Sequence, residues 1–543
     1  MATTINTAKV TGADVPADLP IKRSAHSHVN GKGKGNGNGF SQPPQPLAQI
    51  RSSSVKKKYR HVAAVHSKPR TSCLSHDSES SASFLGFRNL MVLVLIVGNL
   101  RLMIENFQKY GVLICIRCHD YRRQDVILGA ALYFIIPCHL FVAYVVELAA
   151  AQQARASLKG GRKRSGMATP GGSYIASDEE RRKFQSTWKL IAWIHGINIT
   201  FCLGITSVIV YFFIHHPLIG TLSEVHAVIV WLKTASYAFT NRDLRHAYLH
   251  PSKRDEDALP EIYSKCPYPQ NVTLSNLTYF WWAPTLVYQP VYPRTTKIRW
   301  VFVLKRLAEC FGLSAFMWIA SAQYAAPVLR NSLRTISSLD LPSILERLMK
   351  LSTISLVIWL AGFFALFQSF LNALAEVTMF GDREFYSDWW NSPSVGVYWR
   401  TWNKPVYQFM KRHVFSPLVG RGWSTGQASI AVFVFSGVLH ELLVGVPTHN
   451  IIGQFNLESS LDGSGLTFQI GVAFLGMVAQ LPMIAITAPL EKMEGINGRI
   501  IGNCIFWVSF TLIGQPLAAL LYFFAWQAKY GTVSKQPVVA SSS

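Results

Sequence analysis

The sequence is poor in charged residues, above all in acidic ones. Only 15% of its 543 residues are Asp, Glu, Lys or Arg, with 29 acidic against 52 basic side chains, whereas 50% are hydrophobic. Soluble domains carry about 25% charged residues, so this composition excludes an ordinary soluble protein. Long apolar runs instead predict an all-α polytopic membrane protein.

Signatures of several other classes are also missing. The eight cysteines are scattered, so no disulfide framework is predicted. Cys115, Cys118 and His119 form C-x-x-C-H, but no second ligand pair follows at a spacing that suits a metal or a haem. No nucleic-acid motif accompanies the net charge of +23, which gathers in tails and loops and suits anionic lipid surfaces. We expect no metal site and no nucleic-acid partner.

The first 83 residues are rich in Gly, Ser, Pro, Asn and Lys, and no hydrophobic region lies near Met1. Such a segment buries too little apolar surface to offset its chain entropy. We expect residues 1–83 to be a disordered basic tail without a cleavable signal peptide. Residues 84–530 would then form the transmembrane domain, and residues 531–543 a C-terminal tail.

About nine apolar runs are long enough to cross a membrane, which takes about twenty residues. The first and fourth are the weakest because Arg101 or Lys233 lies inside them, although either side chain can reach the interface or serve an interior polar role. The runs fall near residues 87–106, 125–150, 188–214, 219–239, 300–324, 352–378, 427–446, 467–489 and 502–526.

Basic residues in the connections predict the orientation. Residues 151–186 contain many Lys and Arg, whereas residues 447–466, whose structure the sequence leaves open, contain none. The positive-inside rule places the first segment in the cytosol and the second on the opposite side, with a cytosolic N-terminus and a lumenal C-terminus. The basic residues of the short connection at 109–123 argue the other way and are outweighed. The sequons at Asn271 and Asn276 then lie in the cytosol, so we expect neither to be glycosylated.

Polar chemistry is concentrated in residues 381–441. Four tryptophans lie within residues 389–402, interleaved with Asp, Arg and Asn, as is typical of a segment at the boundary between bilayer and water. The apolar run that follows holds His440 and Glu441 near its middle. An ionisable pair at that depth costs several kcal/mol, which makes it a functional candidate.

The run Phe385-Tyr-Ser-Asp-Trp-Trp-Asn391, followed by an intramembrane histidine, resembles the F-Y-x-D-W-W-N hallmark of the membrane-bound O-acyltransferase family. Its flank Phe380-Gly-Asp-Arg-Glu384, together with Ala283-Pro-Thr-Leu-x-Tyr288 and Ile513-Gly-Gln-Pro516, is similar to the type 1 diacylglycerol branch rather than the sterol branch. The resemblance covers roughly residues 84–530. It implies an endoplasmic reticulum enzyme that moves an acyl group from acyl-CoA, a substrate and not a cofactor, to 1,2-diacylglycerol. It also implies a homo-oligomer, either a dimer or a tetramer.

Acyl transfer to an alcohol needs a base for the hydroxyl proton, a donor for the oxyanion and exclusion of water. Histidine suits the first task because its unperturbed pKa lies near neutrality. By the resemblance, His440 is the catalytic histidine. His139, His195 and His226 also lie in apolar runs and stay open as alternatives.

The resemblance implies further site residues. Asn403 matches the second catalytic position, where an amide donates to an oxyanion without adding charge, although an Asn there can also simply cap a helix. Glu441, Met477, Gln480 and Gln515 are expected to line the reaction chamber. Adjacent residues on a helix point about 100° apart, so contact between Glu441 and His440 is not assured. For the two glutamines, ordinary hydrogen bonds between helices are the alternative.

The Trp-rich segment, residues 381–426, is the expected entrance for acyl-CoA. Its basic residues complement phosphates and its rings can stack on adenine, unless they meet lipid headgroups instead. The residues assigned to acyl-CoA binding are Tyr386, Asp388, Trp389, Trp390, Asn391, Trp399, Arg400, Trp402, Lys404, Tyr407, Arg412 and His413.

Two other functions stay open. A sterol or a wax alcohol could replace diacylglycerol as the acceptor with the same chemistry. A transporter is an alternative of another class, because transporters also place His, Glu and Gln within the membrane. That class predicts internal repeats with paired broken helices, and the sequence shows no convincing repeat.

The orientation is directly testable. Protease added to sealed microsomes should cut between Ala151 and Ser186 and leave residues 447–466 intact, because basic loops are retained in the cytosol. Immunoblotting of the fragments measures the outcome, and the reverse pattern would overturn the topology.

Overall fold

The described part of the chain is almost entirely helical, which confirms the all-α polytopic membrane fold. The chain divides into two compact units, Met1–Leu95 and Ile96–Ser543, and every contact discussed below lies within the second. The expected tails and the C-x-x-C-H sequence lie outside the described residues. The computed structural model describes residues 85–113, 122–165, 178–249, 259–337, 341–449, 454–457, 466–469, 471–493 and 496–530.

Eight helical segments among the described residues are long and apolar enough to cross a membrane. A ninth predicted span, residues 300–324, is also helical but is not among them, and Lys305, Arg306 and Glu309 lie inside it. The eight are Asn89–Tyr110, Arg123–Ser157, Thr187–Phe213, Pro217–Leu249, Leu341–Val377, Thr425–Val444, Val472–Glu491 and Gly498–Phe523.

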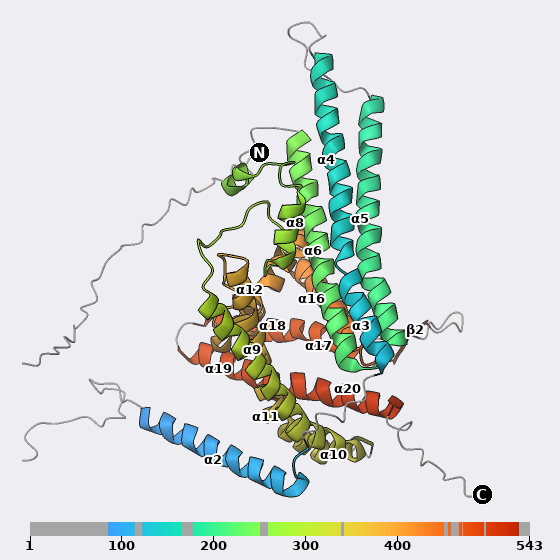
Figure 1. The fold of residues 1–543 in the computed structure, drawn as a ribbon. Coiled ribbons are helices and arrows are strands. Elements are labelled where there is room, and N and C mark those ends of the chain that lie inside the picture. The colour runs from blue at the N-terminus through green and yellow to red at the C-terminus, as the bar shows by residue number, and fades with distance from the viewer. Residues whose placement is uncertain are drawn as a thin grey trace, which may run out of the picture. The chain divides into compact units, whose positions relative to one another are not determined.

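The N-terminal half is built around three long helices, α4, α5 and α6, which pack against one another (Figure 1). Small buried residues such as Ala143 and Ala227 let these helices approach closely. The helix α3 leads into α4 through Pro137, which cannot donate a backbone hydrogen bond. The bounds are α2 (Leu85–Tyr110), α3 (Arg123–Ile135), α4 (Cys138–Ser165), α5 (Asp178–Phe213) and α6 (Pro217–Leu249).

The middle of the chain contains two shorter helical elements and then two long broken helices. The helix α9 packs along α11, η4 and α12. The bounds are η2 (Glu261–Lys265), α8 (Leu274–Trp282), α9 (Trp300–Ala320), η3 (Ser321–Ala325), α10 (Ala326–Ser337), α11 (Leu341–Phe363), η4 (Phe364–Phe370) and α12 (Leu371–Val377).

The C-terminal part contains the Trp-rich segment and the last membrane helices. The helix α16 packs against α17 and α6, and α13 packs against α18. The bounds are η5 (Trp389–Asn391), α13 (Val395–Thr401), α14 (Lys404–Met410), η6 (Lys411–Phe415), α15 (Ser416–Gly420), α16 (Thr425–Val444), α17 (Val472–Val478), α18 (Gln480–Lys492), α19 (Ile496–Val508), η7 (Ser509–Gly514) and α20 (Gln515–Tyr530).

A small antiparallel hairpin lies in the connection whose structure the sequence left open. Strand β1 (Gln454–Leu457) pairs with β2 (Leu466–Gln469), with Phe455 opposite Phe468. This hairpin adds two short strands to an otherwise helical fold.

Lys233, in the middle of the fourth predicted run, has an interior polar role. Its Nζ donates to the carbonyl oxygens of Phe280 and Ala283, at 2.8 and 2.9 Å, where α8 ends. The last carbonyls of a helix lack intrahelical donors, so a buried ammonium satisfies them and balances the negative end of the helix dipole. Lys233 therefore attaches α8 to α6.

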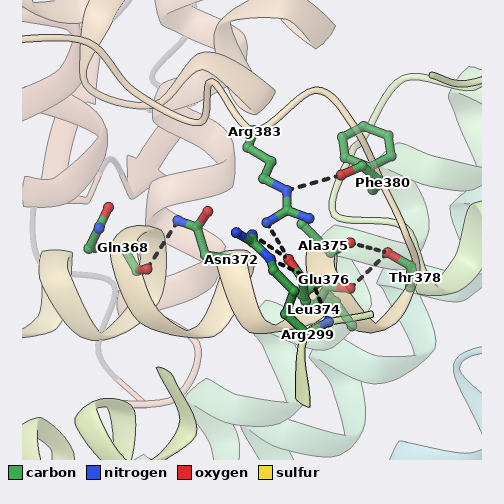
Figure 2. Close-up of polar contacts among 9 residues, drawn as sticks. All are labelled: Arg299, Gln368, Asn372, Leu374, Ala375, Glu376, Thr378, Phe380 and Arg383. Atoms are coloured by element: carbon green, nitrogen blue, oxygen red, sulfur yellow. Dashed lines mark hydrogen bonds and ion pairs between the residues drawn. The ribbon is translucent and has the colours of Figure 1, made fainter. Parts of the chain in front are cut away.

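An ion-pair cluster attaches the start of the Trp-rich segment to the end of α12, where Arg299 and Arg383 both point toward Glu376 (Figure 2). The Glu376 carboxylate, only 1% exposed, accepts from Arg299 Nε at 3.0 Å and Nη2 at 2.9 Å. Arg383 Nη1 lies 2.6 Å from the same carboxylate. Two guanidinium groups thus compensate one buried charge, which fixes where the segment leaves the helix.

Backbone contacts reinforce this attachment. Gly381 N–H donates to the Pro293 carbonyl at 2.8 Å, and Thr295 N–H donates to the Met379 carbonyl at 2.9 Å. Met379 has a φ of 52°, in the left-handed region that non-glycine residues rarely adopt. The chain therefore turns sharply and pairs with the segment before α9.

The Glu376 cluster predicts a large stability effect. Glu376→Ala leaves the mostly buried Arg383 without its carboxylate and should lower the free energy of unfolding by about 3 kcal/mol. Thermal unfolding of the purified protein, followed by tryptophan fluorescence, measures the change. Glu346→Ala is the matched control, because Glu346 and its partner Lys350 are both exposed, and it should unfold like the wild type. Equal midpoints for both variants would contradict a structural role for the cluster.

Candidate functional site

His440 lies on α16, the helix whose start is fixed by a capping box. The Ser424 side chain accepts from Gln427 N–H, and the Gln427 side chain accepts from Ser424 N–H. Such reciprocal bonds satisfy two otherwise unpaired backbone donors. The apolar residues that follow continue the helix to Val444, so the imidazole of His440 lies within a candidate membrane span.

The hydrogen bonding of His440 selects one tautomer. Its Nδ1 lies 2.7 Å from the Ser436 carbonyl oxygen and 3.4 Å from the Ser436 hydroxyl. The carbonyl contact is much shorter, and a carbonyl can only accept, so Nδ1 carries the proton. The lone pair is then on Nε2, which is the nitrogen able to act as a base.

Glu441 makes its contacts with other helices and does not hydrogen-bond to His440 within the described structure. Its carboxylate accepts from Phe474 N–H at 3.1 Å and from the Tyr522 hydroxyl at 3.0 Å. The same hydroxyl accepts from Ala473 N–H at 3.0 Å. A Cβ on Gly471 would lie 1.7 Å from the carboxyl carbon, so a larger residue there would displace the carboxylate from this position. Glu441 therefore joins α16 to the start of α17 and to α20.

The other expected chamber residues lie on α17, α18 and α20. Met477 is buried on α17, at 7% exposure. Gln480 begins α18, where its Oε1 accepts from Trp399 Nε1 at 3.3 Å and its Nε2 donates to the Gly476 carbonyl at 3.1 Å. Gln480 therefore forms a hydrogen bond between α18 and α13, which is the alternative to a chamber-lining role that the sequence left open. Gln515 begins α20, and its side chain lies outside the described part of the structure.

Asn403 caps the helix α14. Its side-chain oxygen accepts from Val406 N–H at 3.2 Å, as an N-cap residue does. Capping uses only the oxygen, so the NH₂ group keeps its two donors for a second task. Within the described residues no hydrogen bond joins Asn403 directly to His440.

Trp389, expected to bind acyl-CoA, lies in the interior instead. It is 1% exposed and packs against Trp359 and Phe363 of α11, with ring centroids 5.2 and 5.1 Å away, and against Trp507 of α19 at 5.8 Å. Tyr398 of α13 approaches the same ring. This position gives Trp389 a packing role that anchors the Trp-rich segment to the membrane helices.

Apart from Phe385, which is also buried, the remaining residues of the motif are more accessible. Asp388 and Asn391 are exposed, and the Trp390 ring is 41% exposed. Tyr386 is partly buried, and its hydroxyl donates to Gln368 Oε1 at 2.7 Å. The motif thus has two enclosed rings, those of Phe385 and Trp389, and a polar outer face.

Two of the expected acyl-CoA cations already have carboxylate partners. Arg400 Nη2 donates to Glu491 at 3.1 Å, and Lys404 pairs with Glu384. The hydrogen bond from Lys404 lowers the pKa of the Glu384 carboxyl. These pairs reduce the positive charge available to a phosphate, although half-exposed pairs of this kind exchange partners at little cost.

The aromatic residues after the motif are partly enclosed. Trp402 stacks on Tyr398 with centroids 5.8 Å apart and planes at 6°. Trp399 meets Phe433 of α16 edge to face at 5.7 Å. The ring of Tyr407 has Lys411 Nζ 6.0 Å from its centroid.

The last two expected residues lie on η6. Arg412 has no ion pair within the described residues, so its charge is available. His413 Nε2 contacts the Ser236 hydroxyl of α6 at 2.8 Å. Burial, together with nearby Arg412 and Arg242, lowers the pKa of His413 to about 4, so its ring is neutral at physiological pH.

Sequence reasoning missed Tyr522, Gly471 and Gln368. Each matters through contacts with residues elsewhere in the chain, and none belongs to a motif. Backbone bonds hold the motif to α13 and to the start of α14: Ser387 N–H donates to the Thr401 carbonyl, and Lys404 N–H donates to the Phe385 carbonyl. No three His, Cys, Asp or Glu side chains among the described residues are grouped to hold a metal ion.

Comparison with known proteins gives a family match over residues 179–447, to the membrane-bound O-acyltransferase family. Diacylglycerol O-acyltransferase 1-2 of Oryza sativa subsp. japonica is 34% identical over 470 residues, which are 86% of each chain. Diacylglycerol O-acyltransferase 1 of Arabidopsis thaliana is 34% identical over 88% of this chain and 80% of its own length. Diacylglycerol O-acyltransferase 1 of Dictyostelium discoideum is 33% identical over 84% of this chain and 64% of its own length.

Proposed function

Because the chain belongs to the membrane-bound O-acyltransferase family, among the type 1 diacylglycerol acyltransferases, we propose that it transfers the acyl group of a fatty acyl-CoA to 1,2-diacylglycerol. The products are triacylglycerol and free coenzyme A. The observation that carries the chemistry is the orientation of His440, whose protonated Nδ1 bonds to the Ser436 carbonyl and leaves Nε2 basic.

In the proposed step, His440 Nε2 accepts the proton of the acceptor hydroxyl as its oxygen attacks the thioester carbonyl. The tetrahedral intermediate collapses, the carbon–sulfur bond breaks, and the imidazolium returns the proton to the coenzyme A sulfur. The Ser436 carbonyl stabilises the imidazolium through Nδ1. No external acid or cofactor is consumed.

Asn403 is the proposed donor to the oxyanion. Its amide nitrogen is not used in capping α14, so it can donate to the thioester oxygen without placing a charge in an apolar site. Glu441, Met477, Gln480 and Gln515 are proposed to shape the chamber, Glu441 by holding the start of α17 through Phe474 N–H.

The alternative bases do not match the family's catalytic histidine, although one of them, His139, has a comparable hydrogen bond. His139 Nδ1 is 2.8 Å from Asn198 Oδ1, and His226 packs against the ring of Tyr133 at 5.0 Å. The Asn198 oxygen is an amide carbonyl that can only accept, so Nδ1 of His139 also carries the proton. Nδ1 of His226 has no hydrogen bond within the described residues. His195 lies 3.9 Å from Glu147, in a different group of helices.

Acyl-CoA is proposed to approach from the cytosol along the Trp-rich segment, where Arg412 offers a charge without an ion pair among the described residues and Trp390 offers an exposed ring face.

The protein is proposed to lie in the endoplasmic reticulum membrane with a cytosolic N-terminus. With a cytosolic N-terminus, nine crossings would place the C-terminus in the lumen. The structure has eight candidate spans among its described residues, so the ninth crossing would have to be made by α9 together with η3. The homo-oligomer stays a prediction of the family resemblance.

Replacing the base should affect turnover far more than binding. His440→Ala should lower the rate of triacylglycerol formation by about a hundredfold or more, the usual contribution of a general base. Affinity for acyl-CoA should be retained because the headgroup binds elsewhere. Turnover with labelled oleoyl-CoA and binding by calorimetry are measured on the same monodisperse sample. His226→Ala is the matched control and should keep near-normal turnover; a fully active His440→Ala protein would remove His440 from the mechanism.

The acceptor is tested separately. Purified protein with labelled oleoyl-CoA and a panel of alcohols should esterify 1,2-diacylglycerol far faster than cholesterol, ergosterol or a long-chain alcohol. Chromatography of the products measures each rate. An equal or higher rate with a sterol would move the protein to the sterol branch while leaving the acyl-transfer chemistry intact.

A further inference from the structure

A cavity of about 540 Å³ lies between α5, α6, η6 and α16. Its deep part is apolar, with Ile199 on α5 and the stacked rings of Trp231 and Phe435, whose centroids are 5.6 Å apart. Volumes of this size are typical of sites that enclose a small ligand. From Trp188 to Ile199 the α5 wall rises about 17 Å at 1.5 Å per residue, roughly half the thickness of the hydrocarbon core. The lining therefore extends along α5 for a length comparable to one bilayer leaflet.

One part of the lining is polar and basic. Arg242 and Arg245 lie within the last two turns of the long helix α6 and line the cavity together with His195 and His413. Arg245 is paired with Glu147 at 2.7 Å and lies over the Trp188 ring at 4.5 Å. Among the described residues, Arg242 forms an ion pair only with its exposed neighbour Asp243. After these pairs are counted, Arg242 carries the positive charge most available to a ligand.

His195 points to a ligand independently. It is 6% exposed, it lines the cavity, and neither of its ring nitrogens has a hydrogen bond within the described residues. Its nearest carboxylate oxygen, on Glu147, is 3.9 Å from Nε2, beyond hydrogen-bond distance. A buried polar group without a partner costs its full desolvation penalty unless something else supplies the hydrogen bond. A ligand oxygen in the cavity would satisfy it.

We propose that this cavity binds a membrane amphiphile with an anionic head, a carboxylate or a phosphate. The head group accepts hydrogen bonds from Arg242 and His195, and an acyl chain extends along Ile199, Trp231 and Phe435. His413, neutral and bonded to Ser236, lines the cavity as a polar group without charge. The basic lining excludes a preference for cationic heads.

The cavity is separate from the proposed catalytic residues. Its lining contains neither His440 nor Asn403, Met477 or Gln480, and of the twelve residues assigned to acyl-CoA it contains only His413. Phe435 and His440 lie on α16 five residues apart, which places them about 140° apart around the helix. The site would thus hold a lipid against the back of the catalytic helix.

Photocrosslinking of the purified full-length protein tests this site. The probes are diazirine-bearing palmitic acid, phosphatidic acid and hexadecanol, the last as the uncharged match to the fatty acid, and adducts are located by mass spectrometry. Adducts on α5, α6 or α16 peptides around the cavity should be at least fivefold more frequent with one or both anionic probes than with the alcohol. Labelling by one anion alone identifies whether the head is a carboxylate or a phosphate.

Two glycines of α5 provide matched variants. A Cβ on Gly196, which lines the cavity, or on Gly204, which does not, would meet no atom within 4 Å, so both positions accept a larger side chain. Gly196→Phe should fill the cavity and abolish labelling, and Gly204→Phe should label like the wild type. Arg242→Gln, on the exposed end of α6, should remove the preference for anions without filling the cavity.

Three results would overturn the proposal. Equal labelling by the alcohol would show that the head need not be anionic. Persistent adducts in a folded Gly196→Phe protein would place the probe elsewhere. Displacement of the probe by an excess of coenzyme A would make the cavity part of the acyl-donor site, and would leave the proposed acyl transfer unaffected.

Discussion

The carboxylate of Glu441 joins the three helices on which the proposed active site depends. It accepts from a backbone donor at the start of α17 and from Tyr522 of α20, and it is adjacent in the chain to His440. Inside a membrane a helix start cannot bond to water, so these N–H groups need a partner from the protein. Because Glu441 supplies a partner, the base, the buried Met477 and the helix α20 are held in one arrangement.

Sequence reasoning was most successful where a physical requirement acts locally. Membrane spans follow from length and hydropathy, so the eight candidate spans coincide with eight of the nine predicted runs. Residues 300–324 show where this reasoning stops. The run is helical, but it contains three charged residues and is not among the candidate spans. The sequence left two roles open for Lys233, one at the interface and one in the interior. It could not decide between them because the carbonyls that accept from Lys233 belong to a segment about fifty residues away.

The same limit applies to the site. The motif around Trp389 could be found from seven residues, but its burial could not, because the rings that enclose Trp389 come from α11 and α19. Likewise, the chain cannot show in advance that Glu441 turns away from His440, since the direction of a side chain depends on its partners in space. Asn403 illustrates a different outcome: the two roles considered for it are compatible, because the cap uses the oxygen and leaves the nitrogen free.

Asn271 has a consequence for how the protein is made. Its amide nitrogen is buried, at 1% exposure, and donates to Asn241 at 2.7 Å and to the Tyr288 hydroxyl at 3.0 Å, yet the residue belongs to an N-x-T sequon. Oligosaccharide is attached to such sites while the nascent chain is still unfolded in the lumen. A glycan on this nitrogen would remove both hydrogen bonds and could not fit between α6 and the following segment. The fold therefore requires Asn271 to stay unmodified, and delivery of this segment to the cytosolic side during synthesis would ensure that.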